Sequence, residues 1–203
     1  MLVGSVHRPE RTSLFTSPKC RGMIPVNDVL VRRALEQAAL DSSIREIKYR
    51  EGPRIECPPI SLSGAVLRRE DGLFLLRVHE SRPDRNEQQD AQLKFVLQRY
   101  GLQLLERDAQ DIFREPMFSN ARIVWSHAGK PVSLNDRLRF SLALEGGPQR
   151  IIDLEARASS SSDVLAVVCV LACENLVQLI LQEAPLGPQT IVRGINVERR
   201  SKV

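Results

Sequence analysis

Two groups of side chains in this sequence have types and spacing that could do chemistry. Cys169 and Cys173 stand four residues apart in an apolar run, a spacing that could hold a metal ion if further thiol or imidazole ligands came from elsewhere. The sequence has no motif that supplies such ligands, and free cysteine is among the most buried residue types. We therefore interpret the pair as two small core residues and expect no cofactor. His79 could act as a base or a metal ligand, although a lone histidine at a strand end is usually structural or exposed.

The elements that would position this histidine read as a β-hairpin, a helix and a strand. Residues 61–78 alternate as two strands around a Glu-Asp-Gly turn, and the nearly continuous apolar run 73–78 is typical of a central strand covered on both faces. The helix expected over 85–100 would bury Phe95 with its neighbours Ala91 and Val96. Because a helix connects the last two strands, the strand at 102–105 should run parallel to the one before it.

The segments before this hairpin predict one helix and two short strands. Residues 1–25 contain three prolines and no hydrophobic period, which indicates a flexible arm. Residues 28–40 place apolar side chains on one helical face. Residues 44–49 alternate as a half-buried strand, and a short strand at 54–57 is expected to pair with it.

Composition changes at the polar Gly/Pro stretch 126–131, which we interpret as a domain boundary. Helical segments are expected at 108–113 and 116–125 before it, and three helices followed by a β-hairpin after it, an order typical of a winged helix-turn-helix. The later elements are expected at 134–144, 149–158, 163–175, 176–182 and 189–194. The predicted organisation is an arm (1–25), an α/β domain (26–127), a winged-helix domain (132–196) and a basic tail (197–203).

Length and charge limit the class of protein. A chain of 203 residues fits two small domains. Residues 1–19 lack the apolar stretch of about 7–15 residues that is typical of a secretory signal, and no apolar run approaches the ~20 residues of a membrane span. We therefore expect a cytoplasmic protein without a membrane partner. The net charge of +4 is spread over both halves, which permits nucleic-acid contact without demanding it.

In this order of elements the chain resembles the TnsA-type transposon endonucleases over about residues 27–194. The resemblance implies an α/β PD-(D/E)XK nuclease fold, a mixed sheet flanked by helices, followed by a winged helix. In that family one strand carries a magnesium-binding aspartate, and the next carries a glutamate or glutamine two residues before a lysine. Aligned through the turn, these positions hold Gly64, Arg77 and His79, and none keeps its type.

The resemblance thus implies a nuclease frame without its metal site. The family also draws a glutamate from its N-terminal helix, for which Asp28 and Glu36 are the only acids, neither clearly in register. An alternative is a migrated, magnesium-dependent active site. It would use the residues near the end of the central strand and on the following helix: His79, Glu80, Gln92 and Lys94. In the simpler interpretation, Glu80 and Lys94 are solvated.

Basic residues around the former active face offer DNA contact without cleavage. They are Arg68, Arg69, Arg77, Arg82 and Arg85. If Arg77 points into the old cleft, it replaces a metal-binding carboxylate with a cation that can pair with DNA phosphate. Equally, it could neutralise Glu80 or Asp71.

The helix at 163–175 contains no basic residue, so we do not expect it to read bases. A helix this apolar is either buried or presents a docking face to a protein partner. The core side would hold Val164, Val167, Val168 and Leu171. The docking side would then hold Ala166, Val170 and Cys173.

These interpretations favour a non-enzymatic function. The leading hypothesis is an assembly or targeting factor that touches DNA weakly through phosphate and recruits a protein partner through its C-terminal domain. The alternatives are an active magnesium-dependent endonuclease with a migrated site and a pure protein-interaction factor.

Overall fold

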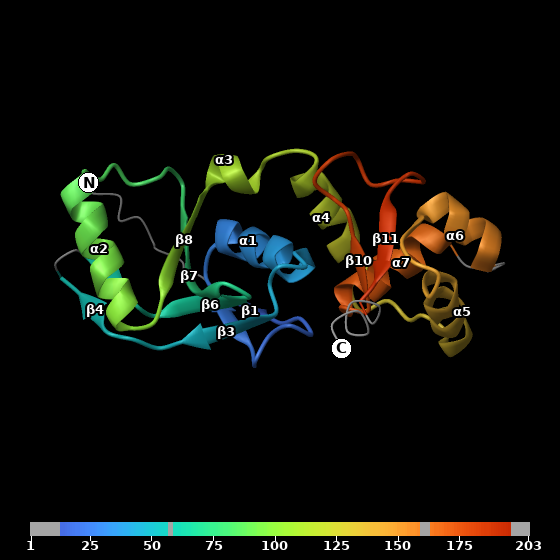
Figure 1. Ribbon diagram of the computed structural model, residues 1–203, viewed down its shortest axis with the longest axis horizontal. Helices are drawn as coiled ribbons and strands as arrows, with labels where there is room; N and C mark the ends of the chain where they lie inside the picture. The colour runs from blue at the N-terminus through green and yellow to red at the C-terminus, as the bar shows by residue number, and fades with distance from the viewer. Residues whose placement is uncertain (1–12, 57–58, 159–162, 196–203) are drawn as a thin grey trace, which may run out of the picture.

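The computed structural model describes residues 13–56, 59–158 and 163–195, and its main sheet has four strands in the order β3-β6-β7-β8 (Figure 1). They are β3 (Glu46–Arg50), β6 (Gly64–Arg69), β7 (Gly72–His79) and β8 (Gln103–Asp108). β3, β6 and β7 are antiparallel neighbours, and β8 runs parallel to β7. The predicted hairpin, the inner position of the apolar strand and the parallel pair are confirmed.

One helix covers each face of this sheet. Leu67 and Phe74 face each other across β6 and β7 and pack with α1 (Val29–Leu40), whereas Val66 and Leu75 pack with α2 (Glu87–Arg99). Because side chains alternate along a strand, the odd-numbered residues of β7 lie on the α2 face. This alternation decides which charged residues share a face.

Local sequence signals explain where both helices begin. The Asp28 carboxylate accepts a hydrogen bond from the Leu30 amide (2.6 Å) as an N-cap, and Asn86 and Gln89 form a capping box at the start of α2. The prediction for the buried face of α2 is wrong, since Leu93 and Leu97 are buried and Phe95 is 62% exposed. Phe95 lies about 200° around the helix from Leu93, and Ala91 is exposed and Val96 only half-buried.

The arm predicted over 1–25 is wrong for the residues that the structure describes. β1 (Ser13–Phe15) and β2 (Ile24–Val26) form an antiparallel hairpin whose Phe15 and Ile24 are 2% and 1% exposed. Burial of these two side chains against α1 and the main sheet fixes the segment. Residues 1–12 and the predicted tail at 197–203 lie outside the described residues.

The predicted pairing of 54–57 with the first strand is also wrong. β3 pairs instead with β6, in a five-residue register, and β4 (Arg54–Ile55) pairs with β5 (Ile60–Ser61). The apolar residues of β6 give β3 a buried partner, which the short polar segment at 54–57 cannot offer.

The C-terminal part contains helices and a small sheet of order β10-β11-β9. After α3 (Ala109–Ile112) and α4 (Met117–Trp125), the elements are α5 (Leu134–Leu144), β9 (Gln149–Arg150), α6 (Ile151–Ala158), α7 (Val164–Cys173), β10 (Val177–Leu179) and β11 (Ile191–Gly194). The predicted helices and hairpin are confirmed, and β9 is an addition that the sequence patterns did not indicate. None of the helices in the described ranges has the length and apolar character needed to cross a membrane.

The predicted docking side of α7 is wrong for two of its three residues. Val170 and Cys173 are 2% and 9% exposed, because α7 packs against α4, α6, α1 and β10. The Cys173 thiol donates to the Val124 carbonyl (3.4 Å). Only Ala166 is partly exposed. Of the two possibilities left open for this helix, the structure shows the buried one.

Helix α4 belongs to two hydrophobic cores at once. Trp125 packs against both, and its indole N–H donates to the Glu36 carbonyl of α1 (2.9 Å). On the other side, the buried Asn120 amide donates to the Leu181 and Ala184 carbonyls (2.8 Å each) and accepts from the Leu186 amide (2.7 Å). The N-terminal sheet and the C-terminal helices are therefore joined through α4, across the predicted boundary at 126–131.

Replacing Asn120→Leu should lower the free energy of unfolding by about 3 kcal/mol or more. The change leaves two carbonyls and one amide without hydrogen-bond partners. These groups surround a side chain that is only 1% exposed, so little water can replace the lost bonds. Urea unfolding followed by circular dichroism measures the effect. Ser119→Ala is the matched control: its hydroxyl bonds to Glu115 at the surface, so a change within about 0.5 kcal/mol is expected. Equal losses for the two variants would contradict this role of Asn120.

Candidate functional site

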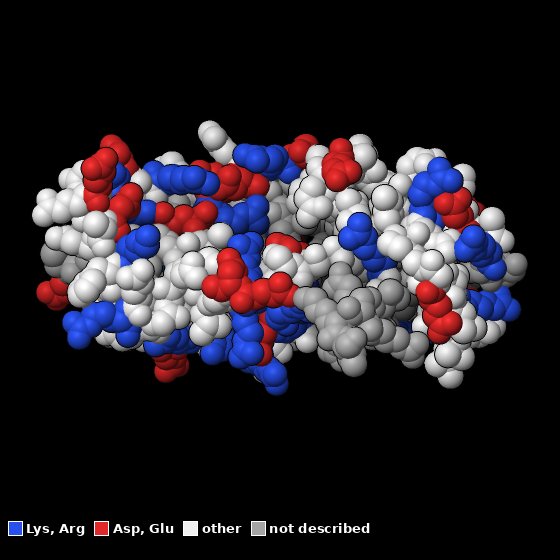
Figure 2. Space-filling view, viewed as in Figure 1, with Lys and Arg blue, Asp and Glu red and all other residues white. Residues whose placement is uncertain are grey.

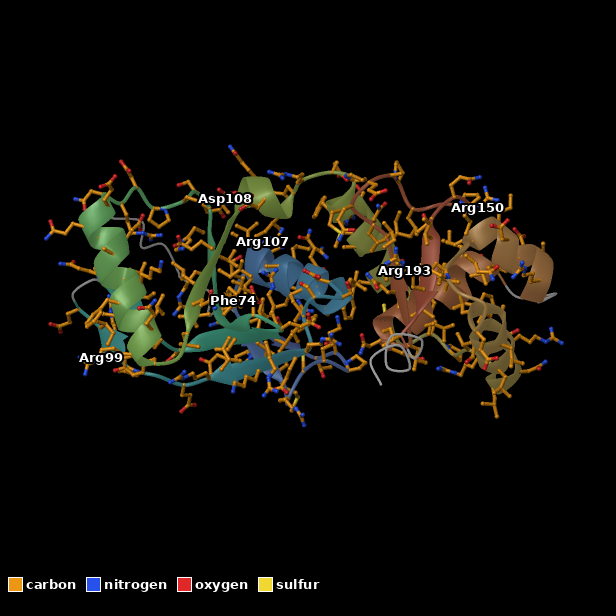
Figure 3. The ribbon with its side chains drawn as sticks, in the orientation of Figure 1. Phe74, Arg99, Arg107, Asp108, Arg150 and Arg193 are labelled. Carbon is orange, nitrogen blue, oxygen red and sulfur yellow. The ribbon has the colours of Figure 1, made fainter. Side chains whose placement is uncertain are left out.

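The charged side chains nearest the predicted site gather at the carboxyl ends of β7 and β8. The parallel register places Arg77 beside Glu106 and His79 beside Asp108. All four therefore share the α2 face of the sheet, at the edge where the labelled Asp108 ends β8 (Figure 3). We call this group, with Arg82, Arg85 and Asp111, the strand-end cluster.

Arg77 occupies the space that a side chain at position 64 would need. Gly64 has φ +151°, a conformation that favours glycine, and a Cβ built on it would lie 2.9 Å from Nη1 of Arg77. Nη2 of Arg77 donates to the Ser63 carbonyl (3.1 Å), and burial lowers the pKa of the guanidinium. An aspartate at 64 would thus need both a strained backbone and a displaced arginine. Arg77 bonds here to a carbonyl, and not to Glu80 or Asp71.

His79 and Arg85 both approach the Glu106 carboxylate. Nε2 of His79 is 3.2 Å from Oε1 of Glu106, in an alignment that does not form a hydrogen bond. Arg85 pairs with the other oxygen, Oε2, and its Nε donates to Asp90 (2.8 Å). The hydrogen bond to Glu106 raises the pKa of Arg85. The Glu106 carboxylate thus forms an ion pair with Arg85, which opposes its use as a metal ligand.

Arg82 bridges two further carboxylates. Its Nε lies 3.1 Å from Asp108, and its Nη2 donates to Asp111 (2.6 Å). This hydrogen bond lowers the pKa of Asp111. The guanidinium fills the place between the two acids where a cation would bind, and no group of three or more His, Cys, Asp or Glu within the described ranges could hold a metal ion. Glu106, Asp108 and Asp111 were not identified from sequence, because the strand was expected to end at residue 105.

The residues of the migrated-site alternative are not joined to one another by an ion pair in the described part of the chain. Glu80, Gln92 and Lys94 are all exposed, and across 13–56, 59–158 and 163–195 no salt bridge joins Glu80 to Lys94. The backbone carbonyl of Glu80 accepts from the Ala109 amide (3.4 Å), which ties the chain after β7 to α3.

The two acids of the N-terminal helix lie with α1 on the opposite face from Arg77. Asp28 caps the helix, and Glu36 accepts from Arg33 (2.7 Å). Neither carboxylate joins the strand-end cluster.

The five predicted DNA-contacting arginines do not form one patch. Arg77, Arg82 and Arg85 belong to the strand-end cluster, whereas Arg68 lies opposite Leu73 near the start of β7, about 13 Å along the strand from Arg77. Arg69 points to the α1 face, with its guanidinium carbon 5.2 Å from the centre of the Phe74 ring. Over β8 and α3, basic and acidic side chains alternate on the surface (Figure 2).

Sequence comparison finds no match to this chain, either among protein-family models or among curated proteins.

Gly64→Ala should destabilise the protein by about 1–3 kcal/mol, because the new methyl group meets Arg77 in a backbone conformation unsuited to alanine. In Gly64→Ala/Arg77→Ala the steric part is relieved, so the double variant should lose about 0.5–1 kcal/mol less than the sum of the two single changes. Chemical denaturation of all four proteins measures this coupling. Strict additivity would show that Arg77 does not occupy the space beside Gly64.

Cys169 and Cys173 should resist alkylation in the folded protein. Both are buried, and burial raises the pKa of each thiol to about 12, so almost no thiolate exists at pH 8. Mass spectrometry after iodoacetamide treatment at pH 8 should find Cys20, which is half-buried, modified before Cys169 and Cys173. In urea all three should react at similar rates. Fast labelling of Cys169 or Cys173 without denaturant would contradict their assignment to the core.

Proposed function

We propose that this chain is a nuclease-like protein that does not cleave DNA, and that it serves as an assembly or targeting factor. In this proposal residues 26–127 have a PD-(D/E)XK fold. The support is topological: an N-terminal helix, three antiparallel strands, a crossover helix and a parallel fourth strand occur in the expected order.

The observation that carries the proposal is the arginine at the former metal position. Arg77 stands where the second acid would be, and its guanidinium lies against Gly64, where the first acid would be. A bound magnesium ion prefers several carboxylate oxygens, and a fixed cation in that space opposes metal binding by charge and by volume. The same cation is suited to a phosphate oxygen.

DNA contact in this proposal is weak and independent of sequence. The three arginines of the strand-end cluster already have carboxylate or carbonyl partners, so phosphate must compete with Glu106, Asp108 and Asp111. The C-terminal helices and three-stranded sheet would form the winged helix. Burial of α7 by α4 prevents it from entering a DNA groove, so we assign no base recognition to it.

An apolar ridge on α5 supports the recruitment of a protein partner. Leu134, Leu138 and Leu142 are 72%, 55% and 64% exposed and recur every fourth residue, so they lie on one face of the helix. The opposite face is fixed in the core by Phe140 and Leu144. Exposed apolar rows of this kind commonly mark protein contact surfaces.

Salt-dependent DNA binding tests this function. Binding of a short duplex should be measurable at low salt by fluorescence anisotropy and should fall steeply as salt rises. Arg77→Gln/Arg82→Gln should flatten the slope of log K against log salt by about 1–2 units, because each lost phosphate contact releases about one fewer counterion.

Arg150→Gln is the matched control, since Arg150 pairs with Asp153 at the far end of the molecule (Figure 3). An unchanged slope in the double variant would refute the assigned phosphate contacts. No binding at low salt would favour a pure protein-interaction factor, and cleavage of the duplex with magnesium would favour the endonuclease alternative.

A further inference from the structure

A cavity lies on the face of the sheet opposite the strand-end cluster, between α1, the strands and the segment that links α3 to α4. Its volume is about 540 Å³, within the range of roughly 300–1,000 Å³ found for small-molecule sites. Its walls are apolar, and its rim is charged. The apolar lining includes Ala38, Leu67, Leu76 and Leu105.

Two residues that line this cavity, Gln37 and Arg69, each have a buried polar atom without a hydrogen-bond partner within the described residues. Oε1 of Gln37 is an acceptor on a side chain that is 4% exposed, and its amide nitrogen is already used by the Ile112 carbonyl (2.8 Å). Nε of Arg69 is a donor. Leaving such groups unmet costs about 1–3 kcal/mol each. A ligand that offers one donor and one acceptor would satisfy both.

Arg107 adds a cation that no carboxylate contacts in the parts of the chain that the structure describes. Its guanidinium bonds to the Asp111 carbonyl (3.0 Å), and burial lowers its pKa. Nearby acids are engaged elsewhere: Asp111 is held by Arg82, and both oxygens of Glu115 accept from Ser119. A desolvated guanidinium in this position is stabilised by an oxyanion.

The remaining acid at the rim does not close the site to an anion. Asp41 accepts from the Ser43 amide (2.8 Å) and lies 3.9 Å from Nη2 of Arg69. Arg114, which is largely exposed and 3.8 Å from Asp111, stands at the mouth as a further cation. The rim thus offers guanidinium groups, and Gln37, whose amide oxygen has no hydrogen-bond partner within the described residues, belongs to the lining.

We propose that this cavity binds a small phosphorylated ligand with a flat or apolar body, the chemistry of a nucleoside monophosphate. The phosphate lies against Arg107 and the rim, the body lies between α1 and the sheet, and an N–H or O–H of the ligand donates to Gln37. The cavity is on the face opposite Arg77, so this site does not depend on the proposed DNA contact.

Calorimetric titration of the whole chain with AMP, GMP, CMP and UMP tests this site. At least one should bind with a Kd below about 1 mM, and inorganic phosphate and the free nucleoside should each bind at least tenfold more weakly. Arg107→Gln should weaken binding by about tenfold or more, the loss expected for a charge-assisted hydrogen bond. Arg99→Gln, which alters an exposed arginine on α2, should leave it unchanged.

Hydrogen exchange gives a readout that does not depend on a variant. A bound nucleotide should slow exchange at 34–41 and 111–117 in the unaltered protein, and Arg107→Lys, which keeps the charge, should retain part of the affinity. No binding by any nucleotide at about 5 mM would overturn the proposal. Equal affinity for phosphate alone would reduce the site to an anion contact and refute the role given to Gln37 and the apolar walls.

Discussion

The structure depends most on helix α4, which is shared between two hydrophobic cores. One side of it packs on α1 through Trp125, and the other covers α7 and is held by Asn120. Because both sides are buried, the N-terminal sheet and the C-terminal helices cannot separate without exposing apolar surface. The same packing removes α7 from solvent, which is why an all-apolar helix is tolerated there and why it cannot act as a DNA-reading element.

Because side chains alternate along a strand, the charged residues of β7 and β8 lie on two different faces of the sheet. The α2 face carries Arg77 and the acids of β8, where each carboxylate that could serve a metal is matched by an arginine. The α1 face carries Arg107 above an apolar cavity whose buried donor and acceptor are unmet. A frame built for hydrolysis would need carboxylates free of arginine on one face. In this chain Gly64 and Arg77 fit each other sterically, and under the proposed nuclease-like fold they stand at the metal positions.

Helices and strands with a strong hydrophobic period could be predicted from the sequence. The strands and helices that each of them contacts could not. The apolar run of β7 and the helical face of α1 are local signals, and both were identified. Val170 was assigned to a surface because a helix that is apolar on every side gives no sign of which side meets a neighbour. Glu106 was missed for a similar reason: its place beside Arg77 follows from strand register, which depends on distant pairing. The family resemblance identified the site positions 64, 77 and 79. Only the structure showed that Arg82 and Arg85 pair with the acidic residues there.

Calorimetric titration of magnesium and manganese into the purified protein, followed by plasmid nicking under the same conditions, shows whether the strand-end cluster holds a metal ion. We expect neither saturable metal binding nor nicking, because guanidinium groups occupy the positions between the carboxylates. Metal binding that is lost in Glu80→Ala, together with nicking, would contradict this expectation and would identify an enzyme with a displaced active site.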